Sequence, residues 1–533
     1  MFKSYKPCDK LRTNHIPDIQ RLIPRCWMSG ILLALILVMA FFLRIYGIEN
    51  APPGIYPDEA LNANEAINAL ETWKFKIFYD TNNGREGLFI NLIALSFSIF
   101  GIGAWQLKLV SALVGILTVL GIYLLTKTIY SDLEAKFPSQ FSKHAPFFAM
   151  FFLATSFWHI NFSRISFRAI LTPLFLTFAF WMLFTAIKKQ KWHYFAVAGI
   201  IFGLGFHTYP AFRIAPLLLS FAVCWHFFKT KNRKKYLINL LVLFSTLIIF
   251  LSPLIVYSLQ HQGIFSERAS QISIFHSVSP YYEILKNTAL TLGQFNIKGD
   301  CNWRHNYSCQ PLIFWTIGIF FIAGIFLAFK NIRLFHFAFL LFWFFISLLP
   351  AILTNEGIPH SLRSIGSIIP VYIFASIGFL YIFNRIYAQI QKWQESQEHK
   401  EYNKQLRRIK MEFIILSILI LFYSGYIQAW TYFQIWSKHN MTKKEFNQHL
   451  IGAADYLNSL PDDVIKYVVV NTNGVWVDDV PIQAQTVKFI IYGKKNIVYL
   501  KNDQQNKIEK EIKNIIIEIQ NNSWKQLGGS TSK

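Results

Sequence analysis

Long runs of apolar residues, separated by short polar segments, fill most of the chain up to about residue 432. Many runs approach the roughly 20 residues that a helix needs to cross a bilayer, and this pattern excludes a soluble protein. The predicted spans are roughly 31–48, 106–129, 146–162, 169–187, 194–209, 213–228, 236–258, 311–329, 334–353, 365–384 and 412–432. We therefore expect an all-α polytopic membrane protein with about eleven transmembrane helices.

The charges predict the direction of these spans. The net charge of +23 could indicate a nucleic-acid-binding protein, but the basic residues lie in short blocks between apolar runs, which is the positive-inside pattern. The blocks are Lys3 to Arg25, Lys136 and Lys143, Lys188 to Lys191, Lys229 to Lys235, Lys330 and Arg333, and Arg385 to Lys410. All are predicted to be cytoplasmic. The protein is then integral to the plasma (cytoplasmic) membrane, with its N-terminus inside, its C-terminus outside and no nucleic-acid partner.

One apolar run, residues 87–101 (GLFINLIALSFSIFG), is shorter than a span requires. If this run crossed the membrane, the block at Lys136 and Lys143 would lie outside and every later block would invert. We therefore predict that residues 87–101 form a juxtamembrane helix.

The polar segments divide the chain into three regions. Residues 1–30 are a basic cytoplasmic tail, residues 31–432 the membrane domain, and residues 433–533 an extracytoplasmic domain. Outer loops at 49–105 and 260–310 belong to the membrane domain. In the last region, helical patterns at 453–457 and 482–491 alternate with apolar strand patterns at 467–470 and 497–500. This alternation predicts a small α/β domain with a modest core.

The five cysteines indicate no metal centre. No Cys/His arrangement has the spacing of metal ligands, and HExxH is absent. We therefore expect neither a metal nor another cofactor. Cys301 and Cys309 share an outer loop, where a disulfide is chemically permitted, although two free thiols fit the spacing equally well.

An acidic pair, Asp58 and Glu59, follows the first span by about a dozen residues. Behind a proline, such a pair can simply be an ordinary helix start. A helix here places Asp58, Asn62 and Glu65 on one face. Its other face, suited to lie on the bilayer, consists of Ala63, Ala66, Ile67, Leu70 and Trp73. A carboxylate in this position can remove a proton from an attacking hydroxyl or amine.

Cationic side chains are also predicted at this membrane surface. Arg85 would lie at head-group depth, where a guanidinium can bind a phosphate or merely anchor the chain at the interface. Further candidates on the outer side are Arg164, Arg168, His207, Tyr209, Arg213, Arg268, Arg304, His305, His360 and Arg363. Outer arginines oppose the positive-inside bias, so they need acidic partners or an anionic substrate phosphate. For each histidine a structural hydrogen bond is the alternative.

The order of these features resembles the dolichyl-phosphate-mannose protein mannosyltransferase superfamily, in the bacterial branch that includes the aminoarabinose transferases of lipid A. The resemblance covers about residues 30–430. It rests on Pro57-Asp58-Glu59, on Gly84 to Phe89 where many members have Lys-Pro-Pro-Leu, and on Gly101 to Leu113 where members carry Gly…Trp…Arg-Leu-Pro-Ser. Segments such as His207 to Arg213, Gly299 to Asn306 and Glu356 to Arg363 are also expected in prokaryotic relatives.

The resemblance implies an integral-membrane glycosyltransferase of the C type (GT-C). Such enzymes transfer a sugar, with inversion, from a polyprenyl-phosphate donor to a protein, lipid or glycan acceptor outside the cytoplasm. Asp58 matches the catalytic aspartate of the family, Glu59 its acidic partner, and Arg85 the basic residue that contacts the donor phosphate. Arg-Glu-Gly replaces Lys-Pro-Pro here, so Glu86 is expected to compete for Arg85 by pairing with it.

The candidate residues also support sugar transfer from a lipid phosphate when the family resemblance is left aside. A lipid phosphate is already a good leaving group, so its displacement needs one base and cationic stabilisation rather than a carboxyl pair. A transporter or flippase for polyprenyl-linked glycans, or a non-catalytic subunit of a glycosylation complex, is the alternative. Against transport, the predicted spans contain almost no ionisable residues and show no inverted repeat.

Overall fold

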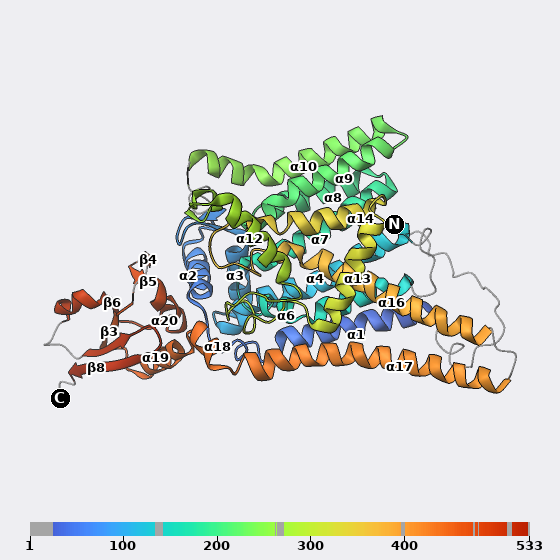
Figure 1. The fold of residues 1–533 in the computed structure, drawn as a ribbon. Coiled ribbons are helices and arrows are strands. Elements are labelled where there is room, and N and C mark those ends of the chain that lie inside the picture. Colours follow the sequence, from blue (N-terminus) through green and yellow to red (C-terminus); the bar gives the residue numbers. More distant parts are fainter. Residues whose placement is uncertain are drawn as a thin grey trace.

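The computed structural model describes residues 25–133, 142–261, 263, 271–395, 400–472, 475–477, 479–508 and 514–530. A bundle of apolar helices carries a smaller α/β domain at one end (Figure 1). The basic tail before residue 25, Lys136 and Arg268 lie outside the described residues.

Each predicted span coincides with an apolar helix. In the described part of the chain, seven helices are long and apolar enough to cross a membrane, and five apolar helices are shorter. The first group comprises α4 (Ala104–Leu133), α7 (Leu171–Lys189), α9 (Ala215–Lys229), α10 (Arg233–Gln260), α14 with α15 (Phe335–Ile346 and Leu349–Ile352), α16 (Ile368–Glu395) and α17 (Lys400–Trp430). The second comprises α1 (Arg25–Ile45), α3 (Leu88–Phe100), α5 (Ala145–Thr155), α8 (Trp192–Gly205) and α13 (Trp315–Lys330).

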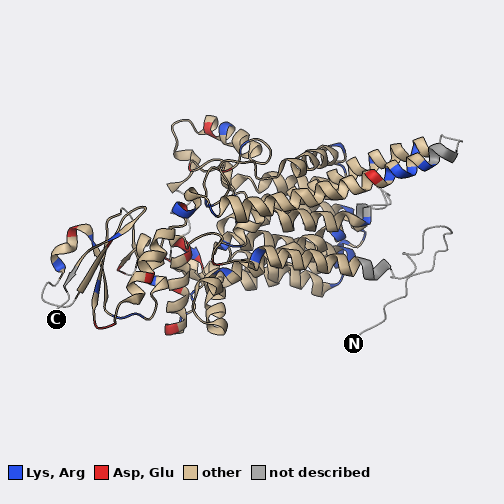
Figure 2. Ribbon diagram, turned by 90° about the horizontal axis from the view of Figure 1, so that it is seen from below, with Lys and Arg blue, Asp and Glu red and all other residues tan. Residues whose placement is uncertain are grey.

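Short elements connect the helices at the end that carries the C-terminal domain. They are α2 (Pro57–Thr72), β1 (Phe78–Tyr79), β2 (Arg85–Glu86), α6 (Phe157–Phe162), η3 (Arg168–Ile170), η4 (Pro210–Ile214), η5 (Ile274–His276), α12 (Pro280–Gly293), η6 (Ile365–Ser367), η7 (Thr431–Trp436) and α18 (Asn440–Glu445). At the opposite end of the bundle, away from that domain, Lys and Arg residues gather (Figure 2). This separation agrees with the positive-inside pattern.

We expect labelling of single cysteines, introduced into a cysteine-free background, to place residues 49–86 and the chain after about residue 434 outside the cell. The N-terminus should be accessible only from inside, because the basic blocks share one side of the membrane. If residues 49–86 and the C-terminal domain were labelled from opposite sides, the predicted topology would be wrong.

Two buried cations hold the chain that leads from α1 to α2. Arg164, fully buried, donates hydrogen bonds to the carbonyls of Leu43, Tyr46, Gly47 and Ala51 at 2.7–3.1 Å. Helix ends leave such carbonyls unsatisfied, and their dipole favours a cation. Lys108 donates similarly to the carbonyls of Pro52 and Gly54. Arg164 therefore finds its partners in the backbone.

Helix α2 packs inside the protein instead of lying on the bilayer. Ala63, Ala66 and Ile67, expected to face lipid, are buried against other protein segments. The contacts of α2 are made mainly with α3 and with α20 (Gln485–Ile490) of the C-terminal domain. The predicted membrane face is therefore wrong for these residues, because α3 and the C-terminal domain pack against the helix.

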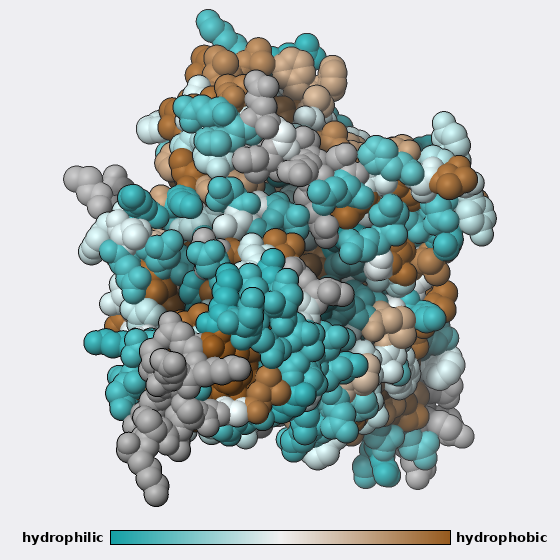
Figure 3. Space-filling model, turned by 90° about the vertical axis from the view of Figure 1, so that its left-hand side faces the viewer, coloured by the Kyte–Doolittle hydropathy of each residue, from teal (hydrophilic) through white to brown (hydrophobic). Residues whose placement is uncertain are grey.

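The C-terminal domain contains a four-stranded sheet in the order β6-β3-β7-β8. β6 (Ile497–Lys501), β3 (Ile465–Val470) and β7 (Asn514–Ile519) are parallel, and β8 (Trp524–Ser530) is antiparallel to β7. A second hairpin joins β4 (Trp476–Val477) to β5 (Val480–Pro481). α19 (Gln448–Ser459), η8 (Ile482–Ala484) and α20 supply the helices, and η9 (Asn502–Lys507) follows β6. Hydrophilic side chains cover much of this end of the molecule (Figure 3), as expected of a face in water.

Candidate active site

A cavity of about 1160 Å³ lies where the bundle meets the C-terminal domain. Its lining comes from the first outer loop, the turns before α7 and α9, η5, the loop at 300–305, the loop at 349–363 and Ile482 of the C-terminal domain. The structure thus brings together most of the predicted site residues: Asp58, Arg85, Arg168, Tyr209, Arg213, Arg304, His305, His360 and Arg363. Glu59 and His207 do not line the cavity.

Asp58 presents an accessible carboxylate to this cavity. It lies in the first turn of α2 and is half-buried. Asn82 donates a hydrogen bond to Oδ1 at 2.9 Å, and the other oxygen accepts none from the described residues. Asn62 follows one turn later on the same face and also lines the cavity. A carboxylate with one oxygen held and one open is suited to accept a proton.

Glu59, the next residue, points the other way. It is fully buried, and its two oxygens accept hydrogen bonds from the backbone N–H groups of Tyr56 (3.1 Å) and Ser166 (2.7 Å). Burial raises the pKa of Glu59, while the charge of Lys108 and these hydrogen bonds oppose the shift. Glu59 therefore closes a capping box at the start of α2. The geometry favours a structural role rather than that of a second catalytic carboxylate.

Arg85 is held within the cavity wall and pairs with an unexpected partner. Its guanidinium bonds to Glu65 at 2.9 Å, Asn62 at 2.5 Å and Thr81 at 2.8 Å, and burial lowers its pKa to about 10. The expected pairing with Glu86 is wrong. Arg85 and Glu86 are consecutive residues of β2, so their side chains point to opposite faces of the strand.

Glu86 instead lies between two other arginines. It is buried, with Arg168 at 3.1 Å on one oxygen and Arg213 at 3.3 Å on the other. Two guanidinium groups around one carboxylate leave an excess of about one positive charge. Arg213 is 43% exposed and Arg168 20%, against 3% for Arg85. This group is therefore the most accessible cationic part of the wall that faces the first outer loop.

Two further arginines line the cavity with partners at its edge. Arg304 stacks over the ring of Tyr56 at 4.2 Å and pairs with Glu445 at 3.5 Å. Arg363 pairs with Glu356 at 3.2 Å and donates to Thr354 at 2.7 Å. Both glutamates are more exposed than their arginines, so solvent screens them more strongly than it screens the cations.

Asp300, His305 and His360 form a buried cluster in the same wall. His305 Nδ1 lies 3.1 Å from Asp300 Oδ2, and the two imidazole rings are 4.9 Å apart. Burial lowers the pKa of both histidines, and the charges of Arg304 and Arg363 add to this shift. Burial acts to raise the pKa of Asp300, but the hydrogen bond and charge of His305 outweigh it and lower the pKa.

The ligand atoms of this cluster lie within 4.8 Å of one another, so it could hold a metal ion. Two features oppose cation binding. The Asp300 carboxylate already accepts hydrogen bonds from His305, from the backbone N–H groups of Asn302 and Ser361, and from the Ser361 hydroxyl. Two arginines lie beside the histidines. The cluster is therefore better suited to hydrogen-bond a polar ligand than to hold a cation.

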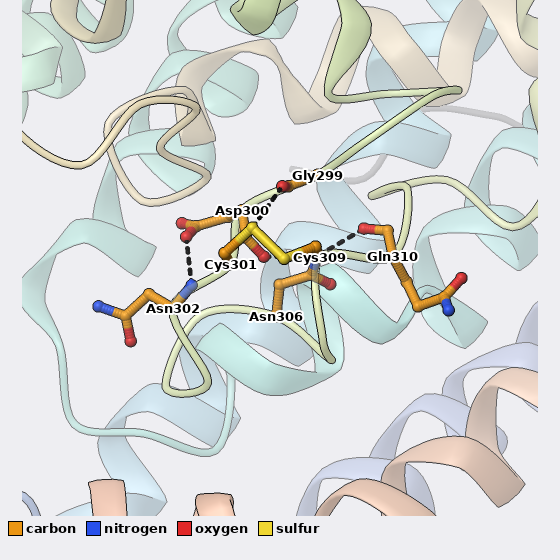
Figure 4. The surroundings of a disulfide bond; sticks show 7 residues. All are labelled: Gly299, Asp300, Cys301, Asn302, Asn306, Cys309 and Gln310. Atoms are coloured by element: carbon orange, nitrogen blue, oxygen red, sulfur yellow. Dashed lines mark hydrogen bonds between the residues drawn. A yellow bond between two sulfur atoms is a disulfide. The ribbon is translucent and has the colours of Figure 1, made fainter.

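A disulfide between Cys301 and Cys309 closes the loop that carries Asp300 and His305 of this cluster (Figure 4). Of the two alternatives that the sequence left open, the structure contains the bonded one. Asn306 donates to the carbonyls of Asp300 and Gln310, which ties the two ends of the loop together. Asp300, Arg304 and His305 of this loop all line the cavity.

His207 takes the structural alternative considered for the histidines. Its Nε2 lies 2.9 Å from the carbonyl oxygen of Phe250 in α10. Conversely, the sequence did not identify Asn62, Asn82 and Tyr56 as cavity residues. Only Asn62 carried a signal, its helical spacing from Asp58.

Comparison with known proteins supports the expected relationship. Residues 88–257 match the family described as dolichyl-phosphate-mannose-protein mannosyltransferase. The putative mannosyltransferase YkcB of Bacillus subtilis (strain 168) is 29% identical over 202 residues, which are 36% of this chain and 26% of that protein. The alignment thus spans about a quarter of the relative's length.

Two solved membrane proteins share the fold. ArnT from Cupriavidus metallidurans, bound to undecaprenyl phosphate, matches with a TM-score of 0.53 and 11% identity over 93% of each chain. Archaeal oligosaccharyltransferase AglB from Archaeoglobus fulgidus, in complex with an inhibitory peptide and a dolichol-phosphate, also matches. Its TM-score is 0.53 and its sequence identity 15%, over 93% of this chain and 69% of that one. The predicted resemblance to the dolichyl-phosphate-mannose protein mannosyltransferase superfamily is therefore confirmed.

Proposed function

We propose that the protein transfers a sugar, hexose or mannose-like, from a polyprenyl-phosphate donor to a protein, lipid or glycan acceptor on the extracytoplasmic face. The observation that carries this proposal is one cavity with an accessible carboxylate, Asp58, and several arginines around it. In the proposed reaction Asp58 removes the proton of the acceptor hydroxyl or amine. The acceptor then displaces the lipid phosphate from the opposite side of the sugar, which inverts the anomeric configuration.

The arginines fit the leaving group. Negative charge develops on the phosphate as its bond to the sugar breaks, and guanidinium groups stabilise phosphate through paired hydrogen bonds. Arg168 and Arg213 are the proposed phosphate ligands, because Arg213 is the most exposed of the paired arginines of the cavity and Arg168 shares Glu86 with it. Arg85, whose two terminal nitrogens already bond to Glu65, Asn62 and Thr81, is proposed to hold the wall around Asp58.

The purified protein, in detergent or nanodiscs, tests this proposal with polyprenyl-phosphate mannose and a set of peptide, lipid and glycan acceptors. Release of free polyprenyl phosphate with an inverted product is the expected result. A protein that moves the intact donor between leaflets, without cleaving it, would show the transport alternative instead.

We also propose that transfer needs no metal, since arginines can stabilise the departing phosphate. Dialysis against EDTA is expected to leave turnover within about twofold of the untreated protein, because each metal ligand candidate already has hydrogen-bond or charged neighbours. Loss of activity that a divalent cation restores would contradict this expectation. The cluster of Asp300, His305 and His360 would then be the first site to examine.

A further inference from the structure

The C-terminal domain meets the helix that carries Asp58 at several points. Building on the proposed function, we infer that this domain fixes the position of α2, and that Gln485 is a positioning residue for Asp58. The domain would then be part of the catalytic unit, acting through α2, rather than a separate acceptor-binding or stabilising module.

Four hydrogen bonds distribute the contact over three points, one just before α2 and two along it. Before the helix, the Thr486 hydroxyl donates to the carbonyl of Ile55 at 3.0 Å. At its middle, Asn64 Nδ2 donates to the Gln485 backbone carbonyl at 3.1 Å and to Gln485 Oε1 at 2.8 Å. Near its end, the Tyr492 hydroxyl donates to Glu71 at 2.8 Å. Contacts at three heights restrain both the position and the tilt of a helix.

Gln485 is itself rigidly placed. It is 1% exposed, and its Nε2 donates to the carbonyls of Val477 (3.1 Å) and Val480 (3.3 Å) in the β4–β5 hairpin. These two bonds identify the nitrogen end of the amide and direct Oε1 toward Asn64. The domain therefore presents a preformed acceptor to α2.

The chain just before α2 is held as closely. A Cβ on Gly54, which has φ +145°, would lie 2.3 Å from the carbonyl oxygen of Phe446, so only glycine allows this approach. The neighbouring Glu445 pairs with Arg304 of the cavity, and Ile482 contributes to the cavity lining. The C-terminal region thus contacts the segment before Asp58, the segment after it and the cavity itself.

This attachment has a physical reason. α2 has 16 residues, and an isolated helix of about that length is only marginally stable in water. A displacement of about 1 Å at a reacting group can lower a rate by about 100-fold. A catalytic carboxylate on the first turn of such a helix therefore depends on its supports.

Asn64→Ala and Gln485→Ala test the inference from the two sides of the contact. Each is expected to lower kcat about 10- to 100-fold, with the KM and affinity for polyprenyl-phosphate donor nearly unchanged. The double variant should be no slower than the worse single one, because both remove the same contact. Asn64→Gln keeps an amide donor for Gln485 and should recover part of kcat. Tyr456→Phe, which removes a bond to Gln526 elsewhere in the domain, should leave kcat unchanged.

Hydrogen exchange separates positioning from unfolding. Amides of α2 should exchange faster in Asn64→Ala and Gln485→Ala, while those of β3 and of the spans keep their protection. Normal kcat and normal α2 protection in both variants would overturn the inference, as would effects that simply add in the double variant. If Asp58→Asn is inactive while Gln485→Ala is fully active, the positioning role fails and the proposed function stands. If Asp58→Asn is fully active, the proposed function fails first.

Discussion

Replacing Asp58 by asparagine is expected to lower turnover by about two to four orders of magnitude, the usual contribution of a general base. Asparagine keeps the shape of the side chain but cannot accept a proton at neutral pH. Its amide can still bond to Asn82 in place of the 2.9 Å contact that Oδ1 makes now. Folding should survive, because a charge in the first turn of a helix contributes only about 0.3–1 kcal/mol.

The measurement is single-turnover transfer with saturating polyprenyl-phosphate sugar, together with donor affinity measured separately. Donor affinity should be unchanged or slightly higher, since Asp58 repels rather than binds a phosphate. A rate near normal for Asp58→Asn would remove this carboxylate from the mechanism and favour transport.

Glu59→Gln is the matched control, one residue away on the same helix. The new amide would direct a donor at the backbone N–H of Ser166 or Tyr56, both of which now donate to Glu59. Leaving such a buried group unsatisfied costs about 1–3 kcal/mol. We therefore expect a lower unfolding temperature, with turnover per folded molecule almost unchanged. The two variants together show whether the acidic pair acts in catalysis or only stabilises the start of α2.

The apolar runs of the sequence predicted the apolar helices of the bundle, because such a helix satisfies its backbone hydrogen bonds within one continuous segment. Charge asymmetry and the outer arginines then indicated the end of the bundle where Asp58, Arg168 and Arg304 meet. Contacts between segments that are distant in the sequence could not be predicted in this way. The contacts of α2 with α20, for example Asn64 with Gln485, join segments more than 400 residues apart.

The sequence also did not predict which charged side chains form ion pairs. Adjacent residues Arg85 and Glu86 looked like partners, yet β2 separates them onto opposite faces. Arg85 pairs with Glu65 of α2, and Glu86 pairs with Arg168 and Arg213, which lie later in the chain. β8 was not predicted, because Lys525, Gln526, Gly528 and Gly529 give it none of the alternation that marks a strand.

Removing the arginines around Glu86 should produce the second large effect, on donor affinity. A hydrogen bond to a charged group contributes about 1.5–3 kcal/mol, and each 1.4 kcal/mol is a factor of ten. Arg213→Ala should therefore weaken polyprenyl-phosphate binding by about 10- to 100-fold, while Arg168 still neutralises Glu86 at 3.1 Å. Arg213→Lys should recover part of the loss, because the charge remains but the paired geometry does not.

Arg85→Ala is the informative comparison, measured by donor affinity and thermal unfolding on the same preparations. It leaves Glu65 buried without its 2.9 Å partner, and an uncompensated buried charge costs about 3–5 kcal/mol. We therefore expect Arg85→Ala to lower the unfolding temperature more than Arg213→Ala does, and Arg85→Lys to restore part of it. The reverse ranking, with Arg85→Ala stable but unable to bind donor and Arg213→Ala binding normally, would make Arg85 the phosphate ligand. Arg213 would then serve only to neutralise Glu86, and the donor would lie closer to α2 than proposed.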